Sequence, residues 1–429
     1  MTMARPAADY ESSGVTSSDL MPLLETAAWV VLAGGAASLI LCIGRQLASM
    51  SGRSAIFQQE LKLLQEQIQT VRDTRRQQKE SSAPWNGTRK FRVARKEKEA
   101  GPVYSFYLSP HDGKVPLPEF LPGQFLTFHL NIDDRSETRC YSLSDSPRPD
   151  LYRVTIKRCP APPDNPDAPP GLVSSHFHDS IKEGEILDVS APQGAFTIDL
   201  AEETPLVLSG AGIGVTPVLS MMKSLMEDTP RREIYFYYGI RDTSENLIAD
   251  EIAEWRSREL PNLHIFVCMC DPLPEDVANE TFDHKGFVTV DLFKEHLPSN
   301  NFDFFTCGPG PMMESIRNGL SEWGVPDSRV HDEAFLAAGK EVEVGEATIT
   351  FKKSGKTVQL SGPSTSLLDI AEEEGVCIPS GCRSGGCGSC KTAILSGQVR
   401  YESPPKIHVE AGSCLPCVCL PEGDLVLDT

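Results

Sequence analysis

The stretch Cys377-Ile-Pro-Ser-Gly-Cys382-Arg-Ser-Gly-Gly-Cys387-Gly-Ser-Cys390 decides how the C-terminal part of this chain folds. From Cys382 the spacing is C-x4-C-x2-C, which is typical of a loop that holds a [2Fe-2S] cluster. The glycines let the backbone turn closely enough to aim three sulfurs inward, and thiolates are the soft ligands that such clusters bind. We therefore expect Cys382, Cys387 and Cys390 to be cluster ligands and the chain to move single electrons.

A fourth ligand must come from later in the chain, where spacing alone leaves Cys414, Cys417 and Cys419 as candidates. The module resembles plant-type ferredoxins, whose last ligand stands in a C-x3-P-x-(S/G)-D context, and Cys417-Val-Cys-Leu-Pro-Glu-Gly-Asp has that register. The resemblance implies Cys417, with Cys419 as runner-up, and leaves Cys414 and Cys377 as buried or incidental thiols. A zinc site and disulfides are the alternatives, but zinc sites usually show two C-x2-C-like pairs.

Length and composition bound the remaining possibilities. The 429 residues leave room for about three domains, and 40% hydrophobic with 23% charged residues is a globular composition. The formal net charge of −20 argues against nucleic-acid binding, because no basic stripe exists to neutralise phosphates. Seven of the 13 cysteines lie after residue 376, which favours a metal module over a disulfide framework.

Residues 27–44 carry no charge, and such a run is just long enough for one transmembrane helix. The preceding tail, residues 1–26, is acidic, which disfavours a cleaved signal peptide; a buried core helix is the third interpretation. The basic residues lie after the segment, so the positive-inside rule predicts a single-pass protein of the inner or plasma membrane with cytoplasmic catalytic domains.

A helical stalk is expected over residues 50–80. Its apolar residues have the 4-3-4-3 spacing of a short coiled-coil seam: Phe57, Leu61, Leu64, Ile68 and Val71. Such a seam indicates either a homodimer held through the stalk or a lone amphipathic spacer helix.

Residues 86–200 show short alternating strands with turn signals, which predict an antiparallel β-barrel. The expected strands are residues 91–98, 105–110, 125–132, 152–158 and 186–191. Within this region lies Arg139-Cys-Tyr141-Ser142. On an extended segment Arg139 and Tyr141 project to one side, so a guanidinium that can grip a phosphate lies beside a ring that can stack on a flat cofactor. Taken on its own, this motif is better explained as an ordinary strand with a surface arginine.

The surrounding segments favour a flavin-binding strand over an ordinary one. Together with R-x-Y-S, the segments LPGQF, GLVSSHFH and APQGAF resemble the flavin domain of the ferredoxin reductase superfamily. The G-x-V-S segment is similar to flavohaemoglobin reductase domains, which bind FAD, whereas the domain order resembles phthalate dioxygenase reductase, which binds FMN. The resemblance implies FAD, with FMN as the alternative.

The same resemblance assigns roles to individual residues of the flavin domain. It implies that Arg139 holds the flavin phosphate, that Tyr141 stacks on the isoalloxazine and that Ser142 hydrogen-bonds near N5. Gly171 and Ser174 would line the phosphate site.

Residues 201–337 alternate buried strands and helices, which predicts an α/β domain with a parallel sheet that binds NAD. The expected strands are PLVLSG, EIYFYYG, HIFVCMC, GFVTVDLF and FDFFTCG, with helices from Pro217, through Ile252 and from Pro311.

The first of these strands runs into Gly210-Ala-Gly212-Ile-Gly214-Val-Thr216-Pro217. The glycines allow close backbone approach, Thr216 can cap, and Pro217 suits the first helical position. A dinucleotide pyrophosphate can then rest on the helix N-terminus. The pattern resembles the G-x-G-x-G-x-T-P form of the reductase superfamily.

Two further segments complete the predicted nicotinamide site. Cys307-Gly308-Pro-Gly-Pro-Met resembles the superfamily's C-G-P-x-P-M segment, which lies where nicotinamide meets flavin, although a buried structural cysteine is the alternative for Cys307. Glu333-Ala-Phe335 resembles the E-x-F ending, whose ring approaches the flavin. We therefore expect Cys307, with Tyr141 and Ser142, to be catalytic.

Asp271 follows the strand HIFVCMC, where NADP-using relatives commonly carry a Ser-Arg pair. A carboxylate there repels a 2′-phosphate but can accept hydrogen bonds from a free ribose hydroxyl, so NADH is the expected coenzyme. Arg241 is the residue that could still bind a phosphate.

Residues 338–429 form the expected ferredoxin module, an α+β domain of β-grasp type, joined by a linker at 337–340 and opened by two alternating strands. The whole pattern predicts a membrane-anchored, NADH-dependent flavin and [2Fe-2S] reductase that passes electrons to an oxygenase or another redox protein. A membrane NADH–quinone reductase and a non-catalytic iron–sulfur sensor are the alternatives.

Overall fold

The computed structural model describes residues 85–161, 167–227, 231–335, 342–401, 405 and 407–429. Within these ranges no helix is both long and apolar enough to cross a membrane. The predicted transmembrane segment 27–44, the stalk 50–80 and the linker 337–340 lie outside the described residues.

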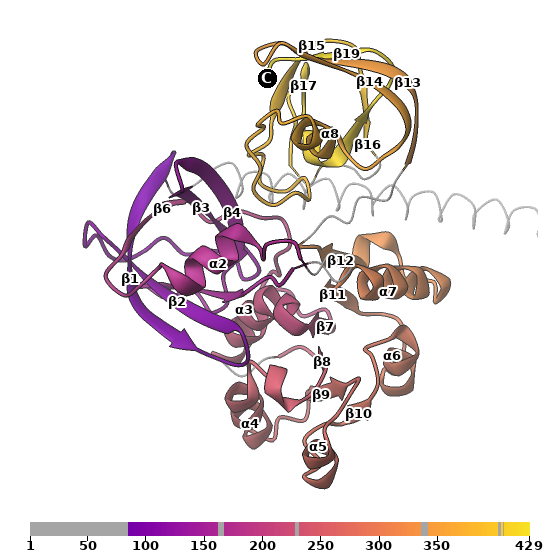
Figure 1. Ribbon diagram of the computed structural model, residues 1–429. Coiled ribbons are helices and arrows are strands. Elements are labelled where there is room, and N and C mark those ends of the chain that lie inside the picture. The colour runs from indigo at the N-terminus through magenta and orange to yellow at the C-terminus, as the bar shows by residue number, and fades with distance from the viewer. Residues whose placement is uncertain (1–84, 162–166, 228–230, 336–341, 402–404, 406) are drawn as a thin grey trace, which may run out of the picture. The chain divides into compact units, whose positions relative to one another are not determined.

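The flavin domain is an antiparallel barrel, as predicted (Figure 1). Its strands follow the order β4-β3-β6-β1-β2-β5, and the sheet closes where Leu143 bridges to Val154 and the Ser144 N–H donates to the Arg153 carbonyl at 2.9 Å. The strands are β1 (Thr88–Lys98), β2 (Val103–Pro110), β3 (Phe125–Ile132), β4 (Arg135–Ser142), β5 (Tyr152–Lys157) and β6 (Ile186–Ser190).

One helix of this domain, α2 (Leu172–Asp179), was not predicted. Its Phe177 is fully buried and meets Phe106 and Phe128 edge-on at 5.2 and 5.3 Å between ring centroids. Phe177 also contacts the ring of Tyr141 at 5.3 Å, so α2 supports the strand that carries the R-x-Y-S motif.

The next domain is an α/β unit whose sheet is parallel throughout, in the order β10-β9-β8-β7-β11-β12, which confirms the predicted class. Its strands are β7 (Leu206–Ala211), β8 (Ile234–Ile240), β9 (Leu263–Met269), β10 (His284–Lys285), β11 (Asp303–Cys307) and β12 (Val330–Glu333). Its helices are α3 (Val215–Met226), α4 (Ala249–Ser257), α5 (Pro274–Ala278), α6 (Val290–His296) and α7 (Gly310–Glu322).

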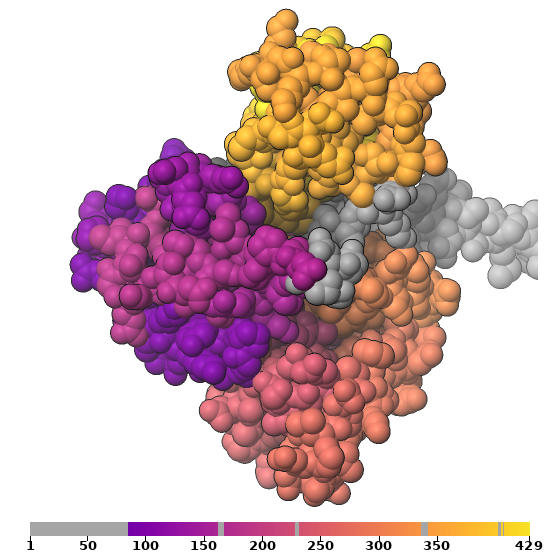
Figure 2. All heavy atoms as spheres, in the orientation of Figure 1, coloured from indigo at the N-terminus to yellow at the C-terminus, as the bar shows by residue number. Residues whose placement is uncertain are grey.

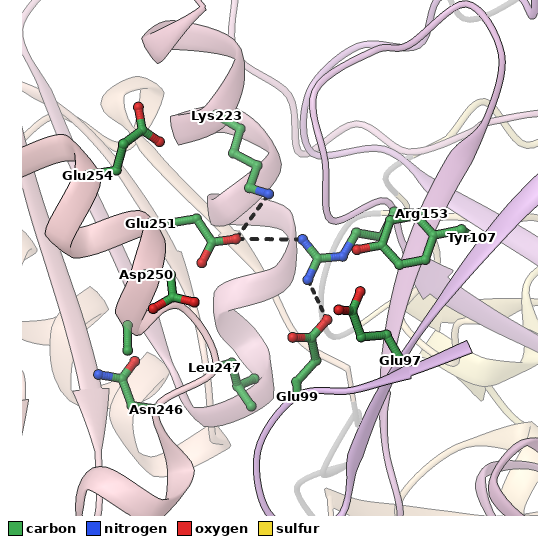
Figure 3. Close-up of a pocket in the computed structure, with 11 residues that line it drawn as sticks. Glu97, Glu99, Tyr107, Arg153, Lys223, Asn246, Leu247, Asp250, Glu251 and Glu254 are labelled. Atoms are coloured by element: carbon green, nitrogen blue, oxygen red, sulfur yellow. Dashed lines mark hydrogen bonds and ion pairs between the residues drawn. The ribbon is translucent and has the colours of Figure 1, made fainter. Parts of the chain in front are cut away.

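The barrel and the α/β unit share one apolar core. Val103 of β2, with Phe196 and Ile198 after β6, packs in the same buried cluster as α3 and the central strands β7 and β8. Beside this core, charged side chains from the barrel and from α3 and α4 line a cavity of about 680 Å³ (Figure 3).

The predicted strand GFVTVDLF is wrong. Strand β10 ends just before Gly286, whose φ of +145° breaks the extended path, and Val290–His296 form helix α6. The Thr289 hydroxyl caps this helix by accepting from the Leu292 N–H at 3.3 Å. Val290 and Phe293 are both buried on one helical face, a spacing that a short apolar run does not distinguish from a strand.

The start of α3 also differs from the expectation. The helix begins at Val215, after a 3-10 turn at Gly212–Gly214, so Pro217 is its third residue. The Thr216 hydroxyl does not cap the helix but donates to the Ile213 carbonyl at 3.0 Å, because Thr216 already lies inside the first turn.

The ferredoxin domain has a mixed five-stranded sheet in the order β14-β13-β19-β15-β17, a β16–β18 pair and its own buried core, which fits the predicted α+β class. In Figure 2 the side chains of this domain form a closely packed body. Its elements are β13 (Val342–Phe351), β14 (Lys356–Ser364), α8 (Leu367–Glu373), β15 (Thr392–Ser396), β16 (Val399–Tyr401), β17 (Ser413–Cys414), β18 (Cys419–Pro421) and β19 (Leu425–Leu427).

Replacing Phe177 with Ala should lower the free energy of unfolding of the flavin domain by about 3–5 kcal/mol, since a fully buried ring with three aromatic partners is removed. Urea unfolding followed by flavin fluorescence measures this. Leu172→Ala, on the same helix but 41% exposed, is the matched control. Equal effects of the two changes would show that α2 does not support the barrel.

Candidate functional site

The cluster loop is shaped so that backbone amides point at two of its thiols. The Gly386 and Cys387 N–H groups donate to Cys382 Sγ at 3.3 and 3.2 Å, and the Cys382 N–H donates to Cys387 Sγ at 3.3 Å. Arg383 and Gly385 have positive φ values of 52° and 71°, which turn these amides inward. Hydrogen bonds of this kind stabilise sulfur ligands that carry negative charge.

The other thiol pair joins the loop to the C-terminal segment. Cys390 Sγ lies 3.3 Å from Cys417 Sγ, whereas Cys419 shares a hydrogen bond with Cys414. Among the described residues no three metal-ligating side chains converge on one point, and the four thiols instead form two pairs. Two pairs of thiolates are what the two irons of a [2Fe-2S] cluster need, so Cys382, Cys387, Cys390 and Cys417 fit the group.

Strand β4 carries the predicted flavin residues. Tyr141 packs edge-on against Phe128 at 5.8 Å, and its burial raises the pKa of the phenol, so the ring stays neutral. Ser142 is buried at the end of the strand. The Arg139 guanidinium is partly exposed, donates to the Thr138 carbonyl at 2.7 Å and lies 3.2 Å from the Glu137 carboxylate. Arg139 therefore has local partners on its own strand.

The segment at the start of α2 is built around Gly171. A Cβ at this position would lie 2.8 Å from Cys159 Cβ and 3.0 Å from Ser174 Oγ, so only glycine fits. The Ser174 hydroxyl donates to the Gly171 carbonyl and accepts from the Cys159 N–H, both at 3.0 Å. Ser175 Oγ is buried without a hydrogen-bond partner, and an unsatisfied hydroxyl at a helix N-terminus fits a phosphate group. The sequence motif contained Ser175, but nothing in it distinguished this residue.

The two glycine-rich turns of the α/β domain lie against each other at the carboxyl ends of β7 and β11. A Cβ on Gly214 would lie 2.5 Å from the Cys307 carbonyl oxygen, and one on Gly308 would lie 3.3 Å from Ala211 Cβ. Gly212, by contrast, has a φ of +51°, and a Cβ there would meet nothing within 4 Å, so its backbone faces open space. The sheet order changes direction between these strands, which is where open α/β sheets bind nucleotides, so the turns fit a dinucleotide.

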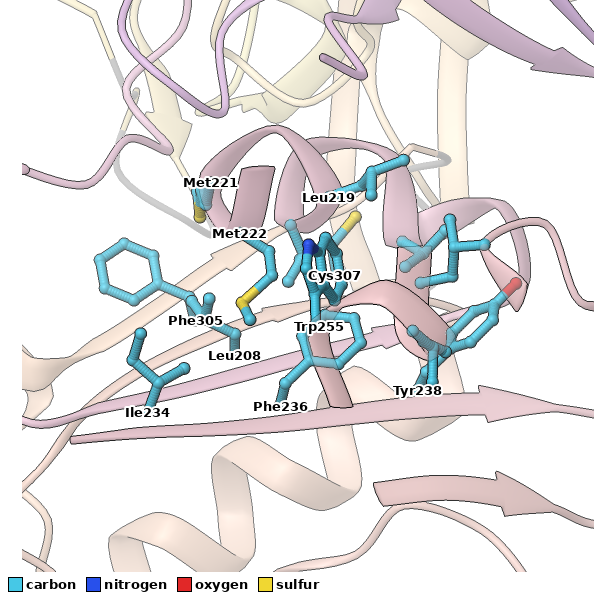
Figure 4. Packing of buried hydrophobic residues seen from close by; sticks show 14 of the residues in the cluster. Leu208, Leu219, Met221, Met222, Ile234, Phe236, Tyr238, Trp255, Phe305 and Cys307 are labelled. Atoms are coloured by element: carbon cyan, nitrogen blue, oxygen red, sulfur yellow. The ribbon is translucent and has the colours of Figure 1, made fainter. Parts of the chain in front are cut away.

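Cys307 itself is fully buried. Its side chain lies in the core beneath α3, among residues that include Leu219 and Trp255 (Figure 4). The contribution of Cys307 to the turn in this structure is therefore its backbone. Phe335, the other predicted aromatic contact, follows β12 and is 37% exposed.

Asp271 and Arg241 lie side by side, because the Asp271 N–H donates to the Arg241 carbonyl at 3.0 Å. The Arg241 Nε donates to Asp242 Oδ2 at 3.0 Å, and this hydrogen bond raises the pKa of Arg241. Hydrogen bonds from Ser244 lower the pKa of Asp242, which keeps that carboxylate ionised. The guanidinium that could have bound a 2′-phosphate is thus already paired with an anion.

Cys140, between Arg139 and Tyr141, contacts the cluster loop. A Cβ on Gly381 would lie 3.1 Å from both Cys140 Sγ and Cys387 Sγ. Cys140 shares hydrogen bonds with Cys387 and with the Thr127 hydroxyl, the latter at 3.3 Å. The sequence did not predict a role for Cys140, because nothing in the R-x-Y-S motif gives its second position a partner.

Comparison with known proteins gives three family matches, in chain order. Residues 92–198 match the oxidoreductase FAD-binding domain, 208–318 the oxidoreductase NAD-binding domain, and 349–422 the 2Fe-2S iron–sulfur cluster binding domain. These matches agree with the predicted cofactors FAD, NADH and a [2Fe-2S] cluster.

Two curated relatives match a little more than half of this chain. A flavohemoprotein of Rhodopirellula baltica is 42% identical over 253 residues, which are 58% of this chain and 61% of the relative. One from Halalkalibacterium halodurans is 37% identical over 263 residues, 60% of this chain and 63% of the relative. The chain thus spans less than two thirds of the length of these relatives.

One solved structure matches most of this chain. Phthalate dioxygenase reductase, described as a modular structure for electron transfer from pyridine nucleotides to [2Fe-2S], matches with a TM-score of 0.53 and 28% identity over 80% of this chain and 98% of that one. The FAD/NAD-binding domain of a nitric oxide dioxygenase from Vibrio cholerae matches with a TM-score of 0.50 and 30% identity over 58% of this chain and 99% of that one.

Replacing Cys417 with Ser should remove or strongly perturb the visible iron–sulfur absorption, because Cys417 pairs with Cys390. Cys419→Ser is the matched control and should retain iron and sulfide, since the Cys419 thiol shares a hydrogen bond with Cys414 instead. Iron and acid-labile sulfide analysis with absorption spectra measures both. The reverse result would assign the fourth ligand to Cys419.

Proposed function

We propose that this chain, which belongs to the ferredoxin reductase superfamily, takes a hydride from NADH and delivers electrons singly to a separate redox protein. Its three domains make it an NAD(P)H-dependent flavin and iron–sulfur oxidoreductase. When bound, the flavin accepts the two electrons of the hydride and the cluster passes them on one at a time.

The contact between Cys140 and the cluster loop is the observation that carries this proposal. Cys140 is the neighbour of Tyr141 in the flavin motif, and it shares a hydrogen bond with the proposed cluster ligand Cys387. The strand proposed to bind the flavin and the loop proposed to hold the cluster are therefore in contact at Cys140. Such a contact supports a path in which electrons leave the flavin through the cluster.

Further residues are assigned to this reaction by the same proposal. Arg139 and Ser175 would bind the flavin phosphate beside Gly171 and Ser174, and Tyr141 and Ser142 would hold the ring. The turn at Gly210, Gly212, Gly214 and Thr216, together with Gly308 and the backbone of Cys307, would seat the dinucleotide, with Phe335 beside the flavin.

The acceptor that we propose is an oxygenase component or another redox protein, supported by the domain order shared with phthalate dioxygenase reductase. We also propose, from the sequence alone, anchoring in the inner or plasma membrane through residues 27–44 and pairing through the stalk. With such an anchor a membrane quinone is the alternative acceptor.

Anaerobic mixing of the purified holoprotein with NADH should bleach the flavin absorption first and the cluster absorption afterwards. Cys387→Ser should keep the first phase and lose one-electron reduction of an external protein such as cytochrome c, because one ligand of the cluster is missing. Stopped-flow absorbance resolves the two phases. Absence of flavin bleaching with either NADH or NADPH would refute the reductase and favour the non-catalytic sensor.

NADH should be preferred over NADPH by about tenfold or more in kcat/KM, which corresponds to about 1.4 kcal/mol or more of differential binding. The reasons are the carboxylate of Asp271 and the pairing of Arg241 with Asp242. Asp271→Ala should reduce this preference, whereas Asp291→Ala, which removes an exposed carboxylate from α6, should not. Equal or better kcat/KM with NADPH in the unmodified protein would contradict the assignment.

A further inference from the structure

Arg153 of β5 is a charged residue inside the interface between the barrel and the α/β unit, where its side chain is only 5% exposed. Its guanidinium donates to Glu99 Oε1 at 2.7 Å and to Ser105 Oγ at 3.1 Å, and it lies 5.6 Å from the centre of the Tyr107 ring. Burial raises the pKa of Tyr107 to about 12, so the phenol beside the cation stays neutral. These contacts fix Arg153 within the barrel.

The same guanidinium reaches across to the α/β unit. Arg153 Nη1 lies 3.8 Å from Glu251 Oε1 of α4, and that oxygen also lies 3.1 Å from Lys223 Nζ of α3 (Figure 3). Lys223 Nζ in turn lies 3.4 Å from Asp145 Oδ1, and the Ser220 hydroxyl of α3 donates to the Asp145 carbonyl at 2.8 Å. One carboxylate of α4 is thus held between two cations, one from the barrel and one from α3.

This group of charges contacts the two elements that lead to the proposed cofactor sites. Asp145 stands three residues after Ser142 of the flavin strand, and Lys223 and Ser220 belong to the helix that follows the glycine turn. A chain of buried hydroxyl groups also connects Arg153 to the end of β4. Ser105 Oγ, which accepts from Arg153, lies 2.7 Å from Thr155 Oγ1. Thr155 Oγ1 lies 2.8 Å from the hydroxyl of Ser144, two residues after Ser142. Arg153, Glu251, Lys223 and Asp145 therefore connect the end of β4 to α3.

We propose that these four residues form an ionic latch that sets the distance between the nicotinamide turn and the flavin strand. They are positioning residues for hydride transfer, and the inference rests on the proposed function in assuming that NADH reduces the flavin. Buried ion pairs contribute little net stability but hold groups in one geometry, and a misplacement of about 1 Å between reacting groups lowers a rate about 100-fold. The latch should therefore affect the rate of hydride transfer more than the affinity for NADH.

The test compares two glutamates of α4 that line the same cavity. Glu251→Gln removes the carboxylate shared by Arg153 and Lys223, whereas Glu254→Gln removes one that pairs with Arg258 at the end of the same helix. Stopped-flow reduction of the flavin in the full holoprotein gives the limiting rate and the apparent Kd for NADH. For Glu251→Gln we expect the limiting rate to fall about tenfold or more with Kd changed less than about twofold, and for Glu254→Gln both to stay within about twofold.

Lys223→Met provides a second variant should Glu251→Gln not fold, and it should show the same loss of rate. In the double variant the losses should not add, because both residues belong to one network. The proposal is refuted if Glu251→Gln and Glu254→Gln have equal limiting rates. It is also refuted if Glu251→Gln lowers only the thermal stability and the FAD content and leaves the limiting rate unchanged. If the unmodified protein is not reduced by NADH, the proposed function fails instead.

Discussion

The close approach of two backbone turns is the constraint on which the rest of the α/β domain depends. Gly214 has no room for a Cβ, because the carbonyl oxygen of Cys307 would lie 2.5 Å away. With glycine there, α3 can start directly behind β7 and pack across β11 and β8, in the core that continues to Val103 of the barrel. The position of α3 then determines where Lys223 and Ser220 meet Asp145. Local backbone geometry thus propagates through one helix to the flavin strand.

The sequence predicted those parts of the fold where local pattern and tertiary environment agree. Strands β1 and β6 of the barrel alternate because one face of each is buried, whereas β2, β3 and β5 are buried along most of their length. The central parallel strands β7 and β8 are buried on both faces, which accounts for their apolar runs. The pattern failed at residues 286–293, where a short apolar run was compatible with either strand or helix. Gly286 ends the strand and the Thr289 hydroxyl caps helix α6. Each of these signals is a single residue, and the apolar run around them outweighed both in the prediction. Helices α2 and α8 were missed because each is only two turns long.

The candidate site was predictable only where chemistry requires a particular residue type at a particular spacing. The C-x4-C-x2-C loop is such a case, because this spacing lets one short loop supply a thiol pair with inward-pointing amides and one thiol of a second pair. Sequence spacing does not reveal the properties that single out Ser175, Cys140 and Arg153. The Ser175 hydroxyl is buried without a hydrogen-bond partner, whereas Cys140 and Arg153 contact Cys387 and Glu251, which are distant in the chain. Arg153 lies in an ordinary β-strand and is separated from Glu251 by almost one hundred positions in the chain.

A protein that splits a two-electron donor into single electrons must keep two distances short and controlled, from nicotinamide to flavin and from flavin to cluster. The two contacts found here are of different kinds. Polarizable thiols meet at Cys140 and Cys387, between the proposed flavin strand and the proposed cluster loop, and electron transfer requires only a short gap. The ion pairs of Arg153 and Lys223 with Glu251 join the barrel to α3 and α4, the units between which the proposed hydride transfer would take place, and atom transfer has the more demanding geometry. Ion pairs suit the positioning of the two hydride-transfer groups. Burying a charge costs solvation free energy, and only a well-aligned ion pair offsets that cost, so an arrangement in which one charged partner has moved away is strongly disfavoured.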